Sequence, residues 1–247
     1  MKKDAVKGRA VYVLVFIVLL NMLYPITDGN NAAAQILYQI LYAGLFLLGI
    51  FVTSESRSHI IFSIILAVIW FIAAMFYSLD PTNYWKIQIT YAILLVFHIN
   101  IIWTLIQYIF TAEKVTADVI YAACAVYFLL SFFFVPIYGM LETAMPGSYV
   151  DNTLGGPVQW QQLVYYSLIT LSTAGYGDIL PANMWARMLA GLEVTIGVLY
   201  VAILVARLVS LYDVQRRKEL VVIIDTIPLC GIISPARNGS VAQWQSS

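Results

Sequence analysis

The sequence predicts an all-α integral membrane protein with about six transmembrane helices and a short re-entrant helix and loop between the last two. Of the 247 residues, 62% are hydrophobic and 11% are charged, whereas soluble globular domains are close to half apolar and a quarter charged. Apolar stretches of about 20 residues, the length that a helix needs to cross roughly 30 Å of hydrocarbon, recur along the chain. A single core of this size cannot bury so much apolar surface, so most of it must face lipid.

The apolar stretches lie at six places in the chain. In order they cover residues 11–26, 33–52, 60–77, 87–110, 119–140 and 184–211. Residues 142–181 have a different pattern, in which Gly, Pro, Asp and Asn come first and an apolar run of about a dozen residues then begins at Trp160. This run is too short to span a membrane and ends in a glycine-rich string. It predicts a re-entrant helix and loop, which lipid tolerates only where protein buries it or where it lines water.

Charge placement predicts the orientation of these helices. With the N-terminus inside, 11 of the 13 basic residues fall on the cytoplasmic side and only Lys86 and Arg187 fall outside, which fits the positive-inside rule. Aromatic residues near the expected outer boundary form a belt: Tyr24, Tyr77, Tyr84, Trp85 and Trp185. We expect a multi-pass protein of the cell (inner) membrane with cytoplasmic termini. The alternative at the start is a cleavable signal peptide ending at the alanines 32–34.

Composition also limits the chemistry. The formal net charge is zero, which argues against a nucleic-acid partner. Cys124 and Cys230 show no CxxC or metal-ligand spacing, and the two histidines are His59 and His98. The sequence contains no recognisable nucleophile–base pair or metal cluster. We therefore expect neither an enzyme nor a small-molecule cofactor.

The string Thr-Ala-Gly-Tyr-Gly-Asp at 173–178 suits cation recognition by the backbone. A potassium ion must lose its water to be recognised, and rings of backbone carbonyls replace that water when identical loops from four chains meet on one axis. Inward-pointing carbonyls need backbone angles that favour Gly175 and Gly177. The hydroxyl of Thr173 can supply the innermost ring, and Tyr176 can wedge outward and hold the loop at its diameter. The helix predicted before the string aims its negative end at the cavity.

On these residues, the segment 160–212 resembles the pore module of prokaryotic potassium channels, with a pore helix, a Thr-x-Gly-Tyr-Gly-Asp filter and an inner helix. Past the filter, Pro181, Trp185 and Arg187 match the spacing of small bacterial potassium channels, and Gly197 takes the place of their inner-helix hinge glycine. The resemblance implies a homotetramer in the lipid bilayer that conducts K⁺ passively. It also implies that filter carbonyls bind K⁺, namely those of Thr173, Ala174, Gly175 and Tyr176, with Gly177 completing the filter.

Two departures from the family pattern open alternatives. Ala174 replaces the usual Val or Ile, which loosens the packing behind the filter and allows a weakly selective monovalent cation channel. Tyr165 and Tyr166 replace tryptophans, and the resemblance implies that an aromatic residue at Tyr165 hydrogen-bonds the filter-end Asp178. A third interpretation is a potassium transporter subunit, although such transporters carry four degenerate loops in one chain. The last alternative is that the GYGD string is a chance match in some other kind of membrane protein.

The first four helices lack the signature of a voltage sensor. Voltage gating needs basic residues at every third position of the fourth span, but residues 87–110 contain no Arg or Lys. We therefore expect a six-span channel without a charged sensor helix. Its expected parts are a four-helix transmembrane region at 1–112, a pore domain at 113–213, and a short, partly disordered cytoplasmic tail at 214–247.

Two ionisable residues inside the predicted spans are candidate modulatory residues, and the first is His98. It is either a proton sensor within the membrane or a neutral histidine hydrogen-bonded to a neighbouring helix, with Asn100 of the same span as a further candidate partner.

The second is Glu193. At about 100° per residue, it lies roughly 140° around its helix from Val198. The lumen is expected to be lined by Val198, Val201, Val205 and Val209. Glu193 should therefore lie behind the filter against the pore helix. There it is a buried hydrogen-bonding residue, a group whose protonation gates the filter, or a direct cation site.

Overall fold

The computed structural model describes residues 8–23, 25, 40–45, 47–48, 57–79, 83–153, 155 and 158–226. Most of these residues are helical, which agrees with the all-α part of the prediction. In chain order the elements are α1 (Ala10–Leu23), α3 (Arg57–Leu79), α4 (Tyr84–Thr111), α5 (Ala117–Ala144), β1 (Tyr149–Asp151), α6 (Trp160–Leu171), β2 (Ile179–Pro181) and α7 (Met184–Thr226).

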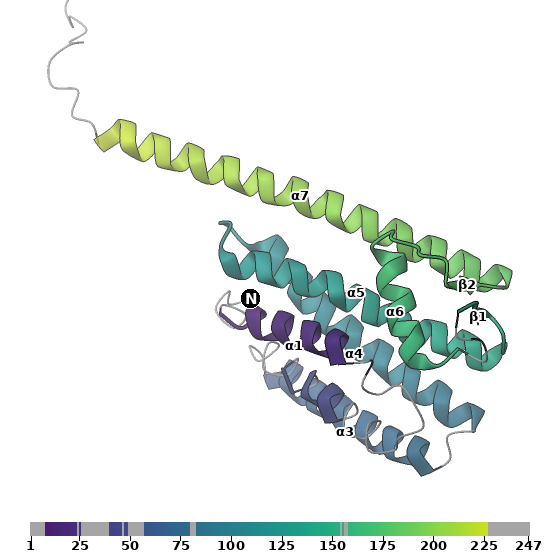
Figure 1. Ribbon diagram of the computed structural model, residues 1–247. Helices are drawn as coiled ribbons and strands as arrows, with labels where there is room; N and C mark the ends of the chain where they lie inside the picture. The colour runs from purple at the N-terminus through teal and green to yellow at the C-terminus, as the bar shows by residue number, and fades with distance from the viewer. Residues whose placement is uncertain are drawn as a thin grey trace, which may run out of the picture.

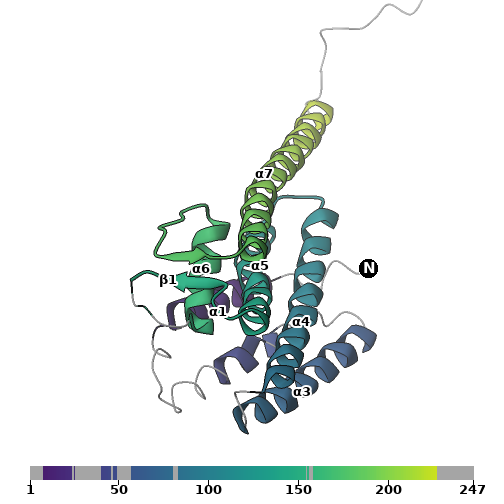
Figure 2. The ribbon, with the colours of Figure 1, turned by 90° about the vertical axis from the view of Figure 1, so that its right-hand side faces the viewer.

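Helix α5 lies at the centre of the bundle. It contacts α1, α4, α6 and α7, while α3 packs against α4 at the edge. Figure 1 shows α7 running beside α5 and continuing past the other helices, with α6 and the two short strands near the start of α7. In the view turned by 90°, α3 and α4 lie on one side of α5, and α6 and β1 lie on the other (Figure 2).

The sequence of α5 explains its central place. Thr116 caps the N-terminus by accepting a hydrogen bond from the Val119 amide at 3.4 Å. Small buried residues such as Ala123 let neighbouring helices come close. At Gly139 a Cβ would lie 2.6 Å from the ring of Tyr91 on α4, so the absence of a side chain sets the distance between these two helices.

Three helices in the described part of the chain are long and apolar enough to cross a membrane: Tyr84–Thr111, Ala117–Ala144 and Met184–Asp213. Two shorter apolar helices, Ala10–Leu23 and Ser63–Ala73, coincide with the first and third expected spans. The second expected span, 33–52, falls largely outside the described residues. The chain is thus a membrane protein with several apolar helices, while six spans and their orientation stay predictions.

Helix α7 is longer than the sequence pattern indicates. It runs for 43 residues without interruption, or about 65 Å at 1.5 Å per residue, twice the thickness of the hydrocarbon. The expected boundary between pore domain and tail at 213 therefore falls inside a helix. The reason is local, because residues 198–227 contain no Gly or Pro and include strong helix formers after 213. Residues 227–247, with the expected disordered end, lie outside the described part.

Arg207 joins α7 to the end of α4. Its Nη2 donates hydrogen bonds to the carbonyl oxygens of Phe110 at 2.8 Å and Ala112 at 3.2 Å. These carbonyls belong to the last turn and C-cap of α4, where carbonyls lack helical partners and the helix dipole favours a cation. The guanidinium therefore holds the C-terminal half of α7 to the C-terminal end of α4.

We predict that Arg207→Ala lowers the free energy of unfolding by about 1.5–3 kcal/mol, the range for hydrogen bonds made by a charged group. The measurement is the thermal unfolding midpoint of the detergent-solubilised protein. Arg217→Ala is the matched control, because it removes an exposed arginine further along the same helix. Equal shifts in the two variants would contradict a specific role for Arg207.

Candidate functional site

The loop between α6 and β2 carries the predicted filter, residues 173–178. Its backbone φ is positive at alternate residues, with 61° at Thr173, 50° at Gly175 and 81° at Gly177. Such alternation collects successive amides on one side of the chain and carbonyls on the other. Glycine adopts these angles readily, and Thr173 is the one non-glycine residue in the described part that adopts them. Strain of this kind is typical of functional loops.

The first amides of the loop point back to the end of α6. Ala174 N and Gly175 N both donate to the carbonyl oxygen of Ile169, at 2.9 and 3.2 Å. In a trans peptide group the carbonyl and the amide point in opposite directions. The carbonyls of Thr173 and Ala174 belong to these same two peptide groups, so they point away from α6. Residues 172–177 are all exposed in the single chain, and the Tyr176 side chain is 75% exposed.

A pair of short strands holds the chain where it leaves the loop. Strand β1 pairs antiparallel with β2, and Val150 lies opposite Leu180. The Asn152 amide donates to the carbonyl of Asp178 at 2.8 Å, and the Ala182 amide donates to that of Ser148, also at 2.8 Å. The segment after α5 therefore fixes both ends of β2. Sequence reasoning missed this pairing, because three-residue strands are too short to show an alternating pattern.

Two acidic side chains support β1. The oxygens of Glu142 accept hydrogen bonds from the amides of Gly147 at 2.8 Å and Tyr149 at 3.0 Å. Asp151, which is buried, accepts a hydrogen bond of 2.7 Å from Nε2 of Gln162 in the first turn of α6. Both carboxylates tie the strand to the helices beside it, and an acid near the N-terminus of α6 is favoured by the helix dipole. The sequence pattern did not indicate these roles of Glu142 and Asp151.

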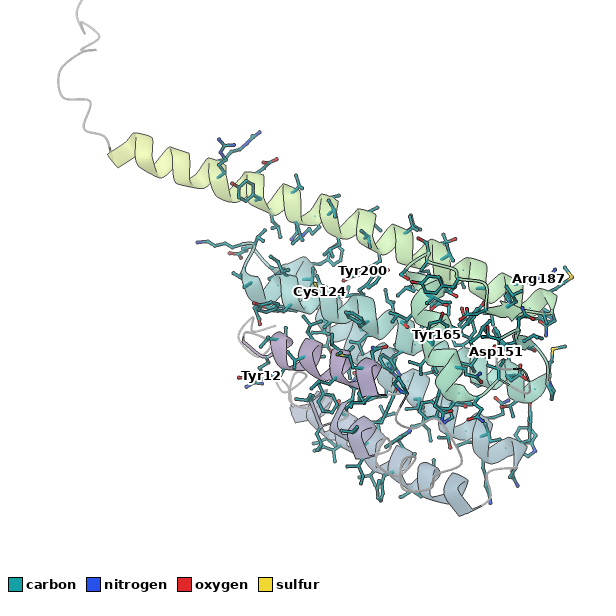
Figure 3. The ribbon with its side chains drawn as sticks, in the orientation of Figure 1. Tyr12, Cys124, Asp151, Tyr165, Arg187 and Tyr200 are labelled. Atoms are coloured by element: carbon teal, nitrogen blue, oxygen red, sulfur yellow. The ribbon has the colours of Figure 1, made fainter. Side chains whose placement is uncertain are left out.

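The predicted supporting residues lie at this same end of the molecule. Figure 3 shows two of them there, Tyr165 and Arg187, together with Asp151, which the sequence did not indicate. Nε of Arg187 donates to the carbonyl of Pro181 at 3.2 Å, directly after the filter. The side chain of Asp178 accepts from the amide of its neighbour Ile179 at 3.0 Å. The expected donation from Tyr165 to Asp178 stays a prediction.

Trp185 lies in the first turn of α7 and is mostly exposed. The cap of this helix is Asn183, whose Oδ1 accepts from the Ala186 amide at 2.8 Å while its Nδ2 donates to Ser148 Oγ at 2.6 Å. Asn183 therefore links the start of α7 to the segment before β1. The sequence signal that marks it is the cap preference of asparagine ahead of an apolar helix.

Gly197, the expected hinge, lies against the end of α6. A Cβ at this position would be 2.4 Å from the carbonyl oxygen of Leu171 and 3.0 Å from its Cδ1. Helix α7 continues through Gly197 without a break. Close packing against the residues just before the filter is thus sufficient reason for a glycine here, and bending at this point stays a prediction.

Glu193 is fully buried, and its carboxyl oxygens are bonded to the hydroxyls of Tyr138 on α5 and Ser167 on α6. As its helical angle predicts, the side chain lies against α6, the helix that precedes the loop 173–178. The expected lumen-facing residues lie on an exposed face of α7: Val198, Val201, Val205 and Val209.

His98 is buried and hydrogen-bonded on both ring nitrogens. Nδ1 donates to the carbonyl of Leu94 at 2.7 Å, which leaves Nε2 to accept from the Tyr42 hydroxyl at 2.9 Å. Its ring stacks on Phe132 of α5, with centroids 6.4 Å apart. This geometry suits a neutral imidazole that links the first helices to α5. Asn100 as a partner of His98 is wrong, because Asn100 Nδ2 instead donates to Ser63 Oγ on α3 at 3.1 Å.

Comparison with known families agrees with this site. Residues 115–213, from just before α5 into α7, match the family described as ion channel. The matched segment includes the strand pair, α6 and the filter loop. No curated protein matches the chain. The prediction of an ion-channel pore domain in this part of the chain is confirmed, and the matched family is one of channels, not of enzymes.

We predict that Gly197→Ala pushes the end of α6 away and lowers the free energy of unfolding by about 1–3 kcal/mol, the usual cost of overpacking. Gly191→Ala lies in the same helix, and its added Cβ meets nothing within 4 Å, so it should be neutral or stabilising by up to about 1 kcal/mol. Thermal unfolding of both purified variants measures the difference. If Gly197 served only as a hinge, the thermal unfolding midpoints of Gly197→Ala and Gly191→Ala would be alike, and this result would contradict the packing role.

Proposed function

We propose that this chain is one subunit of a homotetrameric, potassium-selective channel that conducts K⁺ passively across the cell membrane. The observation that carries the proposal is the loop 173–178, in which φ alternates in sign and the first amides face the end of α6. The carbonyl oxygens of its first two peptide groups thereby point away from α6. Closely spaced carbonyls are the groups that replace the hydration shell of K⁺.

Four copies are proposed because one loop cannot surround an ion. The described part of the chain has a single such loop. Rings of carbonyls form when identical loops from several chains meet on one axis. The exposed apolar face of α7 supports an assembly in which this helix lines a common pathway, with Val201 and Val205 among its exposed residues. We assign residues 113–213 to the pore and 1–112 to the helices around it.

This channel is proposed to work without a voltage-sensing helix. Helix α4, at the fourth-span position, contains Lys86 as its one basic residue, close to its start. Its buried polar member, His98, is hydrogen-bonded on both nitrogens. A helix with no charge ladder has no gating charge to move through the membrane field.

We predict that Gly175→Asp abolishes K⁺ flux from potassium-loaded liposomes, because a side chain at φ 50° distorts the loop and adds charge to the filter. Gly155→Asp is the control. It makes the same substitution at another glycine of positive φ, 72°, where a Cβ meets nothing within 4 Å. Gly155→Asp should retain flux, and equal flux in both variants would overturn the proposed pore.

A weakly selective cation channel is the second candidate, and Ala174 is the observation that favours it, because a small side chain packs loosely behind the filter. We predict that Ala174→Val raises the permeability ratio of K⁺ over Na⁺, measured as reversal potential in mixed salts. Ala182→Val, at an exposed position just past β2, should leave the ratio unchanged. A wild-type reversal potential that ignores the K⁺ gradient would favour the weakly selective channel.

A further inference from the structure

The carboxyl group of Glu193 joins the three helices around the filter. Glu193 belongs to α7 and is 0% exposed. Its Oε2 accepts a hydrogen bond from the Tyr138 hydroxyl of α5, and its Oε1 is hydrogen-bonded to Ser167 Oγ of α6. One side chain of the last helix therefore contacts both the central helix and the short helix that precedes the filter.

The hydroxyl of Ser167 has more oxygen neighbours than it has protons. Besides Glu193 Oε1, it lies 2.8 Å from the carbonyl oxygen of Ser131 and 3.2 Å from Ser131 Oγ. The carbonyl can only accept. If Ser131 Oγ donates to Ser167 and Ser167 donates to this carbonyl, the proton between Ser167 and Glu193 must come from the carboxyl. A neutral carboxylic acid satisfies all of these contacts at once.

The surroundings of the carboxyl favour its neutral form. Around it stand hydroxyl and phenol groups: Tyr138 and Tyr127 of α5, Ser167 and Tyr166 of α6, and Tyr149 of β1. None of these described neighbours carries a positive charge. An ionised carboxylate that is fully buried without a cation is strongly disfavoured. The hydroxyl of Tyr149 is itself buried without a hydrogen-bond partner among the described residues.

We propose that Glu193 is held as a neutral carboxylic acid, which accepts from Tyr138 and donates to Ser167, and that it is a positioning residue for the filter. The consequence for the pore, which rests on the proposed function, passes through α6. Ser167 lies two residues before Ile169, whose carbonyl holds the amides of Ala174 and Gly175. A helix that loses its bond to Glu193 is free to shift this carbonyl and the loop bonded to it.

Infrared spectroscopy tests the protonation state independently of conduction. We expect wild type at neutral pH to show the carbonyl stretch of a protonated carboxyl group. This band should be missing from the spectrum of Glu193→Gln and should therefore appear in the difference between the two spectra. Absence of the band from wild type would overturn the neutral assignment. This result does not depend on whether the protein conducts K⁺.

Reversal potentials test the positioning role. A carboxamide has an acceptor oxygen on one side and a donor NH₂ group on the other, as a carboxylic acid has C=O and O–H, so Glu193→Gln should keep the K⁺ over Na⁺ permeability ratio. Glu193→Ala should lower it by about tenfold, the factor that corresponds to loss of one buried hydrogen-bonded group. Glutamine behaving like alanine, or alanine behaving like wild type, would overturn the proposal. A wild type that passes no K⁺ would defeat the proposed function and leave the infrared result standing.

A pair of hydroxyl deletions covers the case in which Glu193→Ala does not fold. Tyr138→Phe removes the donor to Glu193, and Tyr149→Phe removes the neighbouring hydroxyl that has no partner. We expect a lower permeability ratio in the first variant and an unchanged one in the second. Equal ratios in the two variants would overturn the role of the Tyr138–Glu193 contact.

Discussion

Between α6 and α7 the chain gives up helical hydrogen bonding for about a dozen residues, and at membrane depth every peptide group left without a partner is costly. Residues around the loop 173–178 supply hydrogen-bond partners for several of these peptide groups. At the end of α6 the carbonyl of Ile169 accepts from the first amides of the loop. After α5, the Asn152 amide donates to the carbonyl of Asp178, and the carbonyl of Ser148 accepts from the amide of Ala182 just past β2. The irregular loop is thereby held at both ends.

Because the loop is fixed to α6 and to the strands, whatever positions those elements also positions the loop. Helix α5 does much of this, since it contacts α6 and α7 and carries Tyr138 and Ser131, while Gly197 lets α7 approach the end of α6. The rings of Tyr138, Tyr149 and Tyr166 add a tight apolar cluster, with centroids 5.2–5.3 Å apart. Around the filter, a few polar contacts in an apolar setting set the geometry, because such contacts are strong where water is excluded.

The first helices reach this pore through two different contacts. Near the middle of α4, His98 bridges Tyr42 and the ring of Phe132 on α5. At the end of α4, Arg207 of α7 holds the carbonyls of Phe110 and Ala112. Helix α4 is therefore linked to α5 at one level and to α7 at another. Neither contact requires a charge ladder in α4.

The sequence alone determined much of the local structure. A dozen apolar residues from Trp160 place α6 where it is found, and the long apolar stretches place α4 and α5, because helical hydrogen bonds and hydrophobic length are properties of contiguous residues. The spacing of Gly175 and Gly177 indicated the alternating backbone for the same local reason, and the helical angle of Glu193 indicated that its side chain faces α6.

Only the tertiary structure decided the contacts between distant segments. The β1–β2 pair, the hydrogen bond between His98 and Tyr42, and the packing of Gly197 on Leu171 join residues that are 26 to 56 positions apart, and no periodicity encodes such pairs. The string 173–178 can be recognised in the sequence because its residues are contiguous. The residues that support it cannot be recognised in this way, because they come from distant segments of the chain.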